Sequence, residues 1–167
     1  MDQEEITSQI LNQSGSPTSL ATRLEGRSKF IFFRIGEVLY ALPAEDVQEI
    51  MLNLPIHYLP FLPPYVRGLV NRLGEPVAVV DLQCFFGQIP LEGRAFLILK
   101  PHISKLAFLI DEVQDILSVA STDVGKLSAA FGNLNGYVRG MIRYREKDVL
   151  LLDEWAVIEA VKEAAGA

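Results

Sequence analysis

The chain has 167 residues, of which 50% are hydrophobic and 22% charged, a composition typical of a folded globular domain and not of a disordered chain. Its 21 acidic residues outnumber its 15 Lys and Arg, and the net charge is −6. This balance argues against nucleic acid or an anionic membrane as partner, since either needs a broad basic surface. The single cysteine, Cys84, cannot form an internal disulfide. We therefore expect a cytoplasmic protein.

The first 28 residues differ from the rest of the chain in composition and in hydrophobic pattern. They are rich in Ser, Thr, Gln and Asn and have no sustained apolar period, so we expect residues 1–28 to be a disordered tail with a short helical turn at 4–11. The opening residues lack the basic-then-apolar pattern of a secretory signal. The longest apolar runs are far shorter than the ~20 residues of a membrane span.

From Lys29 onward, short apolar stretches alternate with Gly, Pro and charged turns, which predicts strands rather than long helices. The stretch 38–42 is apolar at nearly every position, as expected for a strand that is covered on both faces. The expected strands are 30–35, 38–42, 68–72, 76–80, 96–100, 106–110, 113–119, 138–144 and 149–152.

Three segments have other patterns. Residues 44–51, after a proline, are predicted as one or two helical turns, although an internal repeat gives part of this segment a strand-like role. Residues 54–64 contain four prolines and predict an extended crossing over the core, with a proline-type ligand for an aromatic groove as the alternative. Asp153 is a good N-cap for a helix over 153–165, with Trp155, Ile158 and Val161 packed on the body.

The internal repeat is carried by two short motifs. The tetrapeptide Tyr-Val-Arg-Gly occurs at 65–68 and again at 137–140, and Val-Gln-Glu-Ile at 47–50 resembles Val-Gln-Asp-Ile at 113–116. Two matches in the same order favour a duplicated unit, with halves at about 29–93 and 94–152. Each half would hold about five short strands and close into a small barrel, which removes exposed edges.

The predicted fold is therefore mainly β. We expect two small five-stranded, barrel-like subdomains that share one hydrophobic core, with a C-terminal α-helix closing the domain over 29–160. The strand order within each subdomain does not follow from these patterns.

Catalytic motifs are missing from the sequence. It has no Gly-x-Ser-x-Gly, no His-Glu-x-x-His and no phosphate-binding loop. His57 and His102 lie on unrelated segments and do not have the spacing of metal ligands. Cys84 lies in an apolar turn without a nearby cation, and the carboxylates at 111–115 are expected in a solvated turn. We predict no enzyme activity, no catalytic residue, no metal and no cofactor.

Polar residues on the hairpin at 68–80 are the remaining candidates for a site. Asn71, Arg72 and Glu75 surround the turn at 73–74, where a rigid scaffold can present donors to a partner. Arg67 and Arg139 open the two equivalent hairpins. A structural role, in which their long side chains lie over the barrel mouth, is the alternative for both.

An ordered set of short segments resembles the CheW family of bacterial chemotaxis coupling proteins over about residues 29–160. The matching segments are FIFF at 30–33, VLYAL at 38–42, VQEI at 47–50, YVRG at 65–68, VVDL at 79–82, FLIDEV at 108–113, YVRG at 137–140 and LLLD at 150–153.

The resemblance implies two five-stranded barrels with a shared interior and a non-enzymatic adaptor function. Such proteins bind the regulatory domain of the histidine kinase CheA and the helical tip of chemoreceptors, so this chain would be recruited to membrane-associated receptor arrays without inserting into the membrane. The partner-binding residues that we predict are Arg67, Asn71, Arg72, Leu73, Gly74 and Glu75.

The hairpin tip departs from the family pattern. The family's turn usually reads Asn-Leu-Arg-Gly, whereas this chain has Asn71-Arg72-Leu73-Gly74, so Leu73 stands at the position of the arginine tied to receptor and kinase coupling. Neighbouring strand residues point to opposite faces, so Arg72 does not simply replace it unless the turn is rearranged. Either the receptor contact differs or the turn register has slipped by one residue. Two alternatives remain open: a coupling protein of another chemosensory pathway, such as type IV pilus motility, or a small-ligand-binding β-barrel.

Overall fold

The computed structural model describes residues 26–134 and 136–166, so most of the predicted N-terminal tail and its helical turn at 4–11 lie outside the described residues. The strands are β1 (Arg27–Ile35), β2 (Val38–Pro43), β3 (Val47–Leu52), β4 (Val66–Arg72), β5 (Glu75–Asp81), β6 (Ala95–Leu99), β7 (Leu106–Ile110), β8 (Glu112–Ala120), β9 (Val124–Gly125), β10 (Val138–Tyr144) and β11 (Lys147–Leu152). The helices are η1 (Ala44–Asp46), α3 (Leu82–Phe85), η2 (Ser121–Asp123), η3 (Ala129–Leu134) and α4 (Glu154–Gly166).

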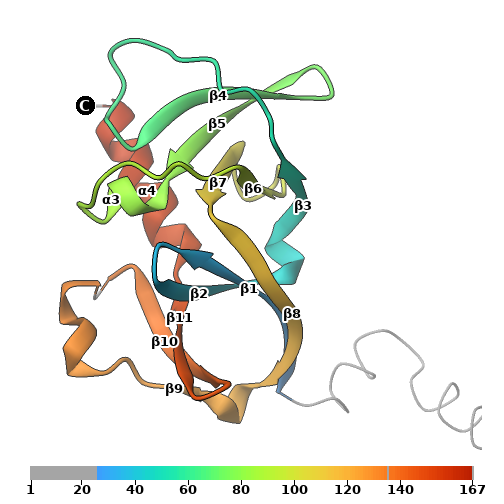
Figure 1. The fold of residues 1–167 in the computed structure, drawn as a ribbon, viewed down its shortest axis with the longest axis vertical. Coiled ribbons are helices and arrows are strands. Elements are labelled where there is room, and N and C mark those ends of the chain that lie inside the picture. The colour runs from blue at the N-terminus through green and yellow to red at the C-terminus, as the bar shows by residue number, and fades with distance from the viewer. Residues whose placement is uncertain (1–25, 135, 167) are drawn as a thin grey trace, which may run out of the picture.

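These strands form two sheets, one above the other in Figure 1, and the mainly β prediction is confirmed. Sheet A has the order β8-β1-β2-β11-β10-β9, and sheet B has the order β3-β6-β7-β5-β4. Each sheet therefore takes strands from both halves of the chain. The parallel pairs β2–β11 and β5–β7 join the halves at the middle of each sheet. The expectation that 29–93 and 94–152 each close on themselves is wrong, because the first hairpin of each half pairs with the last hairpin of the other.

Neither sheet is a closed barrel. Among the described strands, no backbone ladder joins β8 to β9 or β10 in sheet A, or β3 to β4 in sheet B. The predicted barrels are thus two open, curled sheets, in which side-chain contacts join β3 to β4 in sheet B and β8 to β10, the neighbour of the end strand β9, in sheet A.

A shared hydrophobic core between the sheets is confirmed. Along the inner strands of sheet A, successive side chains point alternately into two apolar clusters, so both faces of these strands are covered. In β1, Ile31 and Phe33 contribute to the large core shared with sheet B and α4, whereas Phe30 and Phe32 belong to a smaller cluster inside sheet A. We call this smaller cluster the sheet A interior; its buried members are Phe30, Phe32, Ala41, Val119, Ile142, Val149 and Leu151.

Two local predictions fail. Residues 44–51 form only one 3-10 turn, η1, and continue as strand β3, because β3 pairs with β6 along its length. In α4, Trp155 is 48% exposed and does not lie on the packed face. The buried face is instead made by Glu154, Val157, Ile158 and Val161, at helical spacing. The N-cap at Asp153 is confirmed, since its Oδ1 accepts a hydrogen bond from the amide of Ala156 at 3.1 Å.

The proline-rich segment crosses sheet B as an extended chain as far as Leu59 and then turns at 60–62, where Phe61 has a φ of 65° and is fully exposed. The expected extended crossing over 54–64 is therefore only partly present. Its one regular contact is a two-way backbone bridge between His57 and Leu69. Gly68 allows this approach: a Cβ at this position would lie 2.2 Å from the carbonyl oxygen of His57, and its φ is +137°. The glycine of the first Tyr-Val-Arg-Gly is therefore required by the crossing. Within the part of the chain that is described, no helix has the length and apolarity to span a membrane.

Candidate functional site

The β4–β5 turn carries most of the predicted partner-binding residues, and its backbone is tightly specified. Leu73 and Gly74 have φ of 50° and 86°, the left-handed conformations of a two-residue hairpin turn. The amide of Gly74 donates to Asn71 Oδ1 at 2.7 Å, so Asn71 stabilises the turn from within. The side chain of Leu73 is 86% exposed. The turn therefore presents an apolar side chain to solvent on a fixed backbone.

Arg72 does not extend from the tip of this hairpin. Its guanidinium forms an ion pair with the carboxylate of Glu49 in β3. Because β3 and β4 are the two end strands of sheet B, this ion pair connects the ends of the open sheet. Glu49 was not among the predicted site residues; the one signal that could have found it is its place in the repeated VQEI segment.

The second half of the chain closes sheet A in the corresponding way. Tyr144, 72 residues after Arg72, donates its hydroxyl to Asp115 Oδ2 at 2.8 Å. Asp115 holds the position in VQDI that Glu49 holds in VQEI. This hydrogen bond raises the pKa of Tyr144. Glu49 and Asp115 thus have equivalent positions in the repeated segment. Each connects an end strand, β3 or β8, to the last residue of β4 or β10.

The two hairpin turns also match. Arg145 and Glu146 have φ of 47° and 64°, as Leu73 and Gly74 do in the first hairpin. Arg145 stacks over the ring of Tyr144 with its Cζ 5.0 Å from the centroid. An arginine therefore occupies the tip of the second hairpin at the position where the first hairpin has leucine.

The side chain of Arg67 is 33% exposed, but its guanidinium is bound to other parts of the protein. Its Nη1 lies 2.9 Å from Oδ2 of the fully buried Asp81 and 3.0 Å from the carbonyl oxygen of Leu91. Asp81 also accepts from the amides of Leu91, at 2.8 Å, and Cys84, at 3.0 Å. These contacts connect β4, α3 and the loop after α3. They favour the structural interpretation of Arg67 over a partner-binding one.

Arg139, the counterpart of Arg67, has different surroundings. It is exposed and forms no ion pair with any of the described residues. Asp153, the counterpart of Asp81, caps α4 instead of pairing with an arginine. The duplicated motif therefore has one arginine bound internally and one that faces solvent.

Glu154 is an unexpected buried carboxyl group at the start of α4. Its side chain is fully buried, and neither carboxylate oxygen has a hydrogen-bond donor among the described residues. Burial, followed by the proximity of Asp46 in η1, raises the pKa of Glu154 to about 8, against the opposing effect of Arg139. The helical spacing of 154, 157, 158 and 161 is the signal that could have placed Glu154 on the buried face.

The groups that could carry chemistry lie apart from one another. His57 and His102 are exposed on separate segments. Burial raises the pKa of the Cys84 thiol, which disfavours a reactive thiolate. Asp111 and Glu112 both contact Arg34. Within residues 26–134 and 136–166, no three His, Cys, Asp or Glu side chains are grouped so as to hold a metal ion.

Comparison with known proteins agrees with this architecture. The family model described as a CheW-like domain matches residues 29–162. The Chemotaxis protein CheW of Treponema pallidum is 26% identical over 133 residues, covering 75% of this chain and 78% of that protein. The Probable chemotaxis protein CheW of Rhizobium etli is 25% identical, covering 84% and 94%. Protein FrzA of Myxococcus xanthus is 29% identical over 70 residues, covering 42% and 44%.

A solved structure supports the fold. The scaffolding protein TtCheW of Thermoanaerobacter tengcongensis superposes with a TM-score of 0.68 at 21% identity, covering 75% of this chain and 88% of that one. The two curled sheets, the shared core and the closing helix thus define a CheW-type fold. The chain belongs to the CheW-like domain family and is a coupling protein of the chemotaxis type.

Proposed function

We propose that this chain is a non-enzymatic cytoplasmic adaptor that links chemoreceptors to a CheA-type histidine kinase. Family membership supports the adaptor class. The observation that supports a docking role for the first hairpin is the solvent-exposed Leu73 on a turn fixed by Asn71. An exposed apolar side chain on a rigid tip has little ordering entropy to lose when a partner covers it.

In this proposal the chain makes two contacts at once. The β4–β5 turn, residues 71–75, contacts the helical tip of a receptor, and a sheet flank pairs with the regulatory domain of the kinase. Binding both partners raises their effective concentration for each other and requires no chemistry from the adaptor. In this proposal Arg72 and Arg67 have positioning roles: the ion pair of Arg72 with Glu49 stabilises the base of the turn, and the ion pair of Arg67 with Asp81 stabilises β4.

A second candidate is a coupling role in another chemosensory pathway, such as type IV pilus motility. The observation that favours it is the leucine at the hairpin tip, where the family usually has arginine. A different residue at the tip changes which receptor surface is complementary to the turn.

Calorimetric titration tests both candidates. The full chain is titrated with a CheA-type regulatory domain, and separately with a receptor cytoplasmic tip, from the same genome. We expect binding to both, and we expect Leu73→Ser to weaken the receptor contact about tenfold while kinase binding is retained. Ile89→Ser is the matched control, because Ile89 is 77% exposed on a different loop.

The outcomes separate the candidates. The alternative pathway is favoured if the wild-type chain binds the kinase domain and not the receptor tip, and if Leu73→Arg then binds the receptor tip. Equal effects of Leu73→Ser and Ile89→Ser on the receptor contact contradict the docking role of the turn. Failure to bind either partner contradicts the adaptor function.

A further inference from the structure

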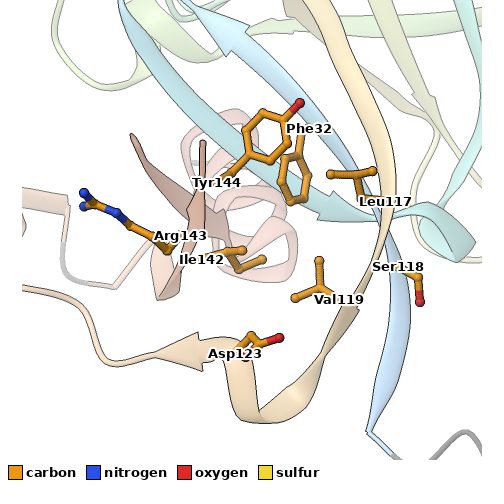
Figure 2. A pocket seen from close by; sticks show the side chains of 8 residues that line it. All are labelled: Phe32, Leu117, Ser118, Val119, Asp123, Ile142, Arg143 and Tyr144. Atoms are coloured by element: carbon orange, nitrogen blue, oxygen red, sulfur yellow. The ribbon is translucent and has the colours of Figure 1, made fainter. Parts of the chain in front are cut away.

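The inside of sheet A is hollowed between its end strands, and we call this hollow the trough. One cavity, of about 440 Å³, lies between β8 and β10 and is drawn in Figure 2. A second, of about 410 Å³, lies toward the start of β1. Both are lined by Val119, so the two cavities are neighbours at β8. Together they have the size of ordinary small-molecule sites.

The floor of the trough is apolar. Figure 2 shows Phe32, Leu117, Val119 and Ile142 directed into a common space, with Tyr144 at one end. These residues belong to the sheet A interior or pack against it, so the floor is separate from the core shared by the sheets. Phe32, Val119 and Ile142 are at most 9% exposed, so an aliphatic ligand would gain chiefly from close packing against these side chains.

The mouth of the second cavity is polar on one side. Arg139 lines it together with Ser28 and Ser121, beside Phe30 and Leu151. Unlike Arg67, Arg139 has no carboxylate within ion-pair distance among the described residues. Its guanidinium offers several donors next to an apolar slot, which suits an anion attached to an aliphatic chain.

The charges around this mouth favour an anion. Arg139 also lines a third cavity, together with Arg27 and Lys29, so three cations border the entrance of a protein whose net charge is −6. Among the described residues, Glu45 is the one acidic side chain that lines this third cavity. In the first cavity one acidic and one basic side chain, Asp123 and Arg143, are both in the lining. Of the residues that the structure describes, Arg139 is thus the one cation that lines the second cavity.

We infer that the trough binds a small single-chain anionic amphiphile, such as a medium-chain carboxylate, with its aliphatic chain along Val119 and its anionic head at Arg139. The ligand is a free carboxylate in solution, not a lipid in a membrane. This function goes beyond partner coupling, because the trough lies inside sheet A and the β4–β5 turn belongs to sheet B.

The test is calorimetric titration of the full chain with decanoate, below its micelle concentration, and with 1-decanol as the uncharged analogue. We expect saturable one-to-one binding of decanoate. Arg139→Gln should lower decanoate affinity about tenfold and change decanol affinity less than about twofold, because only the anion loses a charge-assisted hydrogen bond. Val119→Phe should weaken both ligands, since it fills the part that the cavities share.

Lys162→Gln is the charge-matched control, because Lys162 is exposed on α4 and does not line the trough. If wild type shows no saturable decanoate binding, or if Arg139→Gln and Lys162→Gln have equal effects, the proposal is overturned. It is also overturned if the chain binds phosphatidylglycerol vesicles and not decanoate. Decanoate binding only after deletion of residues 1–25 overturns it in favour of that segment as the occupant.

Discussion

The two hairpins that open with Tyr-Val-Arg-Gly have the same strand pairing and the same left-handed turn, yet their arginines have different environments. Arg67 is bound to a fully buried aspartate and a loop carbonyl, whereas Arg139 faces an open cavity. The difference arises from the segment on the C-terminal side of each hairpin. After β5, the loop that follows α3 folds back, and the amide of Leu91 donates a hydrogen bond to Asp81. After β11, the chain continues directly as the long helix α4. A repeated motif therefore does not imply a repeated function.

The largest difference between the copies should appear in the arginines. Arg67→Met leaves the buried carboxylate of Asp81 without its cation and should lower the free energy of unfolding by about 3–5 kcal/mol. Arg139→Met should change it by less than about 0.5 kcal/mol. Urea denaturation of both variants measures this. Similar losses in the two variants would show that the arginines have equivalent roles.

The pH dependence of the free energy of unfolding should come from Glu154, which follows the second Tyr-Val-Arg-Gly hairpin. The folded-state pKa of Glu154, about 8, lies above its usual 4.5, so the folded protein holds more protons in this window and loses stability as pH rises through it. The loss should be ~3 kcal/mol between pH 5 and pH 8. Glu154→Gln should flatten this dependence in denaturation curves at several pH values.

The control for Glu154 is Glu159→Gln, an exposed glutamate on the same helix. Asp46 and Arg139 are the charged groups that act on Glu154, and both remain in each variant. An unchanged pH profile in Glu154→Gln would show that the carboxyl group does not titrate in this range.

The two glycines of the repeated motif should also differ. Gly68→Ala puts a Cβ against the carbonyl of His57 at a positive φ, and should cost about 2–3 kcal/mol. Gly140→Ala meets the Gly125 carbonyl oxygen at 2.9 Å without a positive φ, and should cost about 1 kcal/mol. Thermal unfolding ranks the two variants; a larger loss in Gly140→Ala would contradict the role of Gly68 in the proline-rich crossing.

The smallest effects should come from the side-chain contacts that join the sheet ends. A double-mutant cycle of Glu49→Gln and Arg72→Met should give a coupling of about 0.5–1 kcal/mol, because this ion pair is partly exposed. The cycle of Asp115→Asn and Tyr144→Phe should give a value of similar size. A coupling of zero in either cycle would show that the corresponding sheet end is held by packing alone.

The sequence predicted the elements of this fold well because most of its strands are apolar runs bounded by glycine, proline or charge. Strands at 106–110 and 138–144 have the predicted bounds, and the two-residue turn at 73–74 is present. The N-cap at Asp153 and the shared core also result from local pattern. The resemblance to the CheW family rests on these same segments, and the family match over residues 29–162 confirms it.

The candidate site was predictable only in part. The sequence located the turn at 71–75, but it could not show that Arg72 reaches Glu49, because those residues lie in strands at opposite ends of one sheet. It predicted partner contacts and a structural role as alternatives for Arg67, and the buried Asp81 favours the second. The partner-binding role of residues 71–75 remains a prediction.

Local pattern determined most of the strands, the turns and the closing helix, since periodicity and turn chemistry act over a few residues; β3 is an exception, because its pairing with β6 overrides the helical pattern. Only the tertiary structure decided how the halves combine. The parallel pairs β2–β11 and β5–β7 connect residues far apart in sequence. The apolar residues of these strands do not by themselves specify which strand will pair with them. The same long-range pairing binds one arginine internally, exposes its counterpart and buries Glu154. These environments depend on which segments become neighbours, and that is a property of the folded chain as a whole.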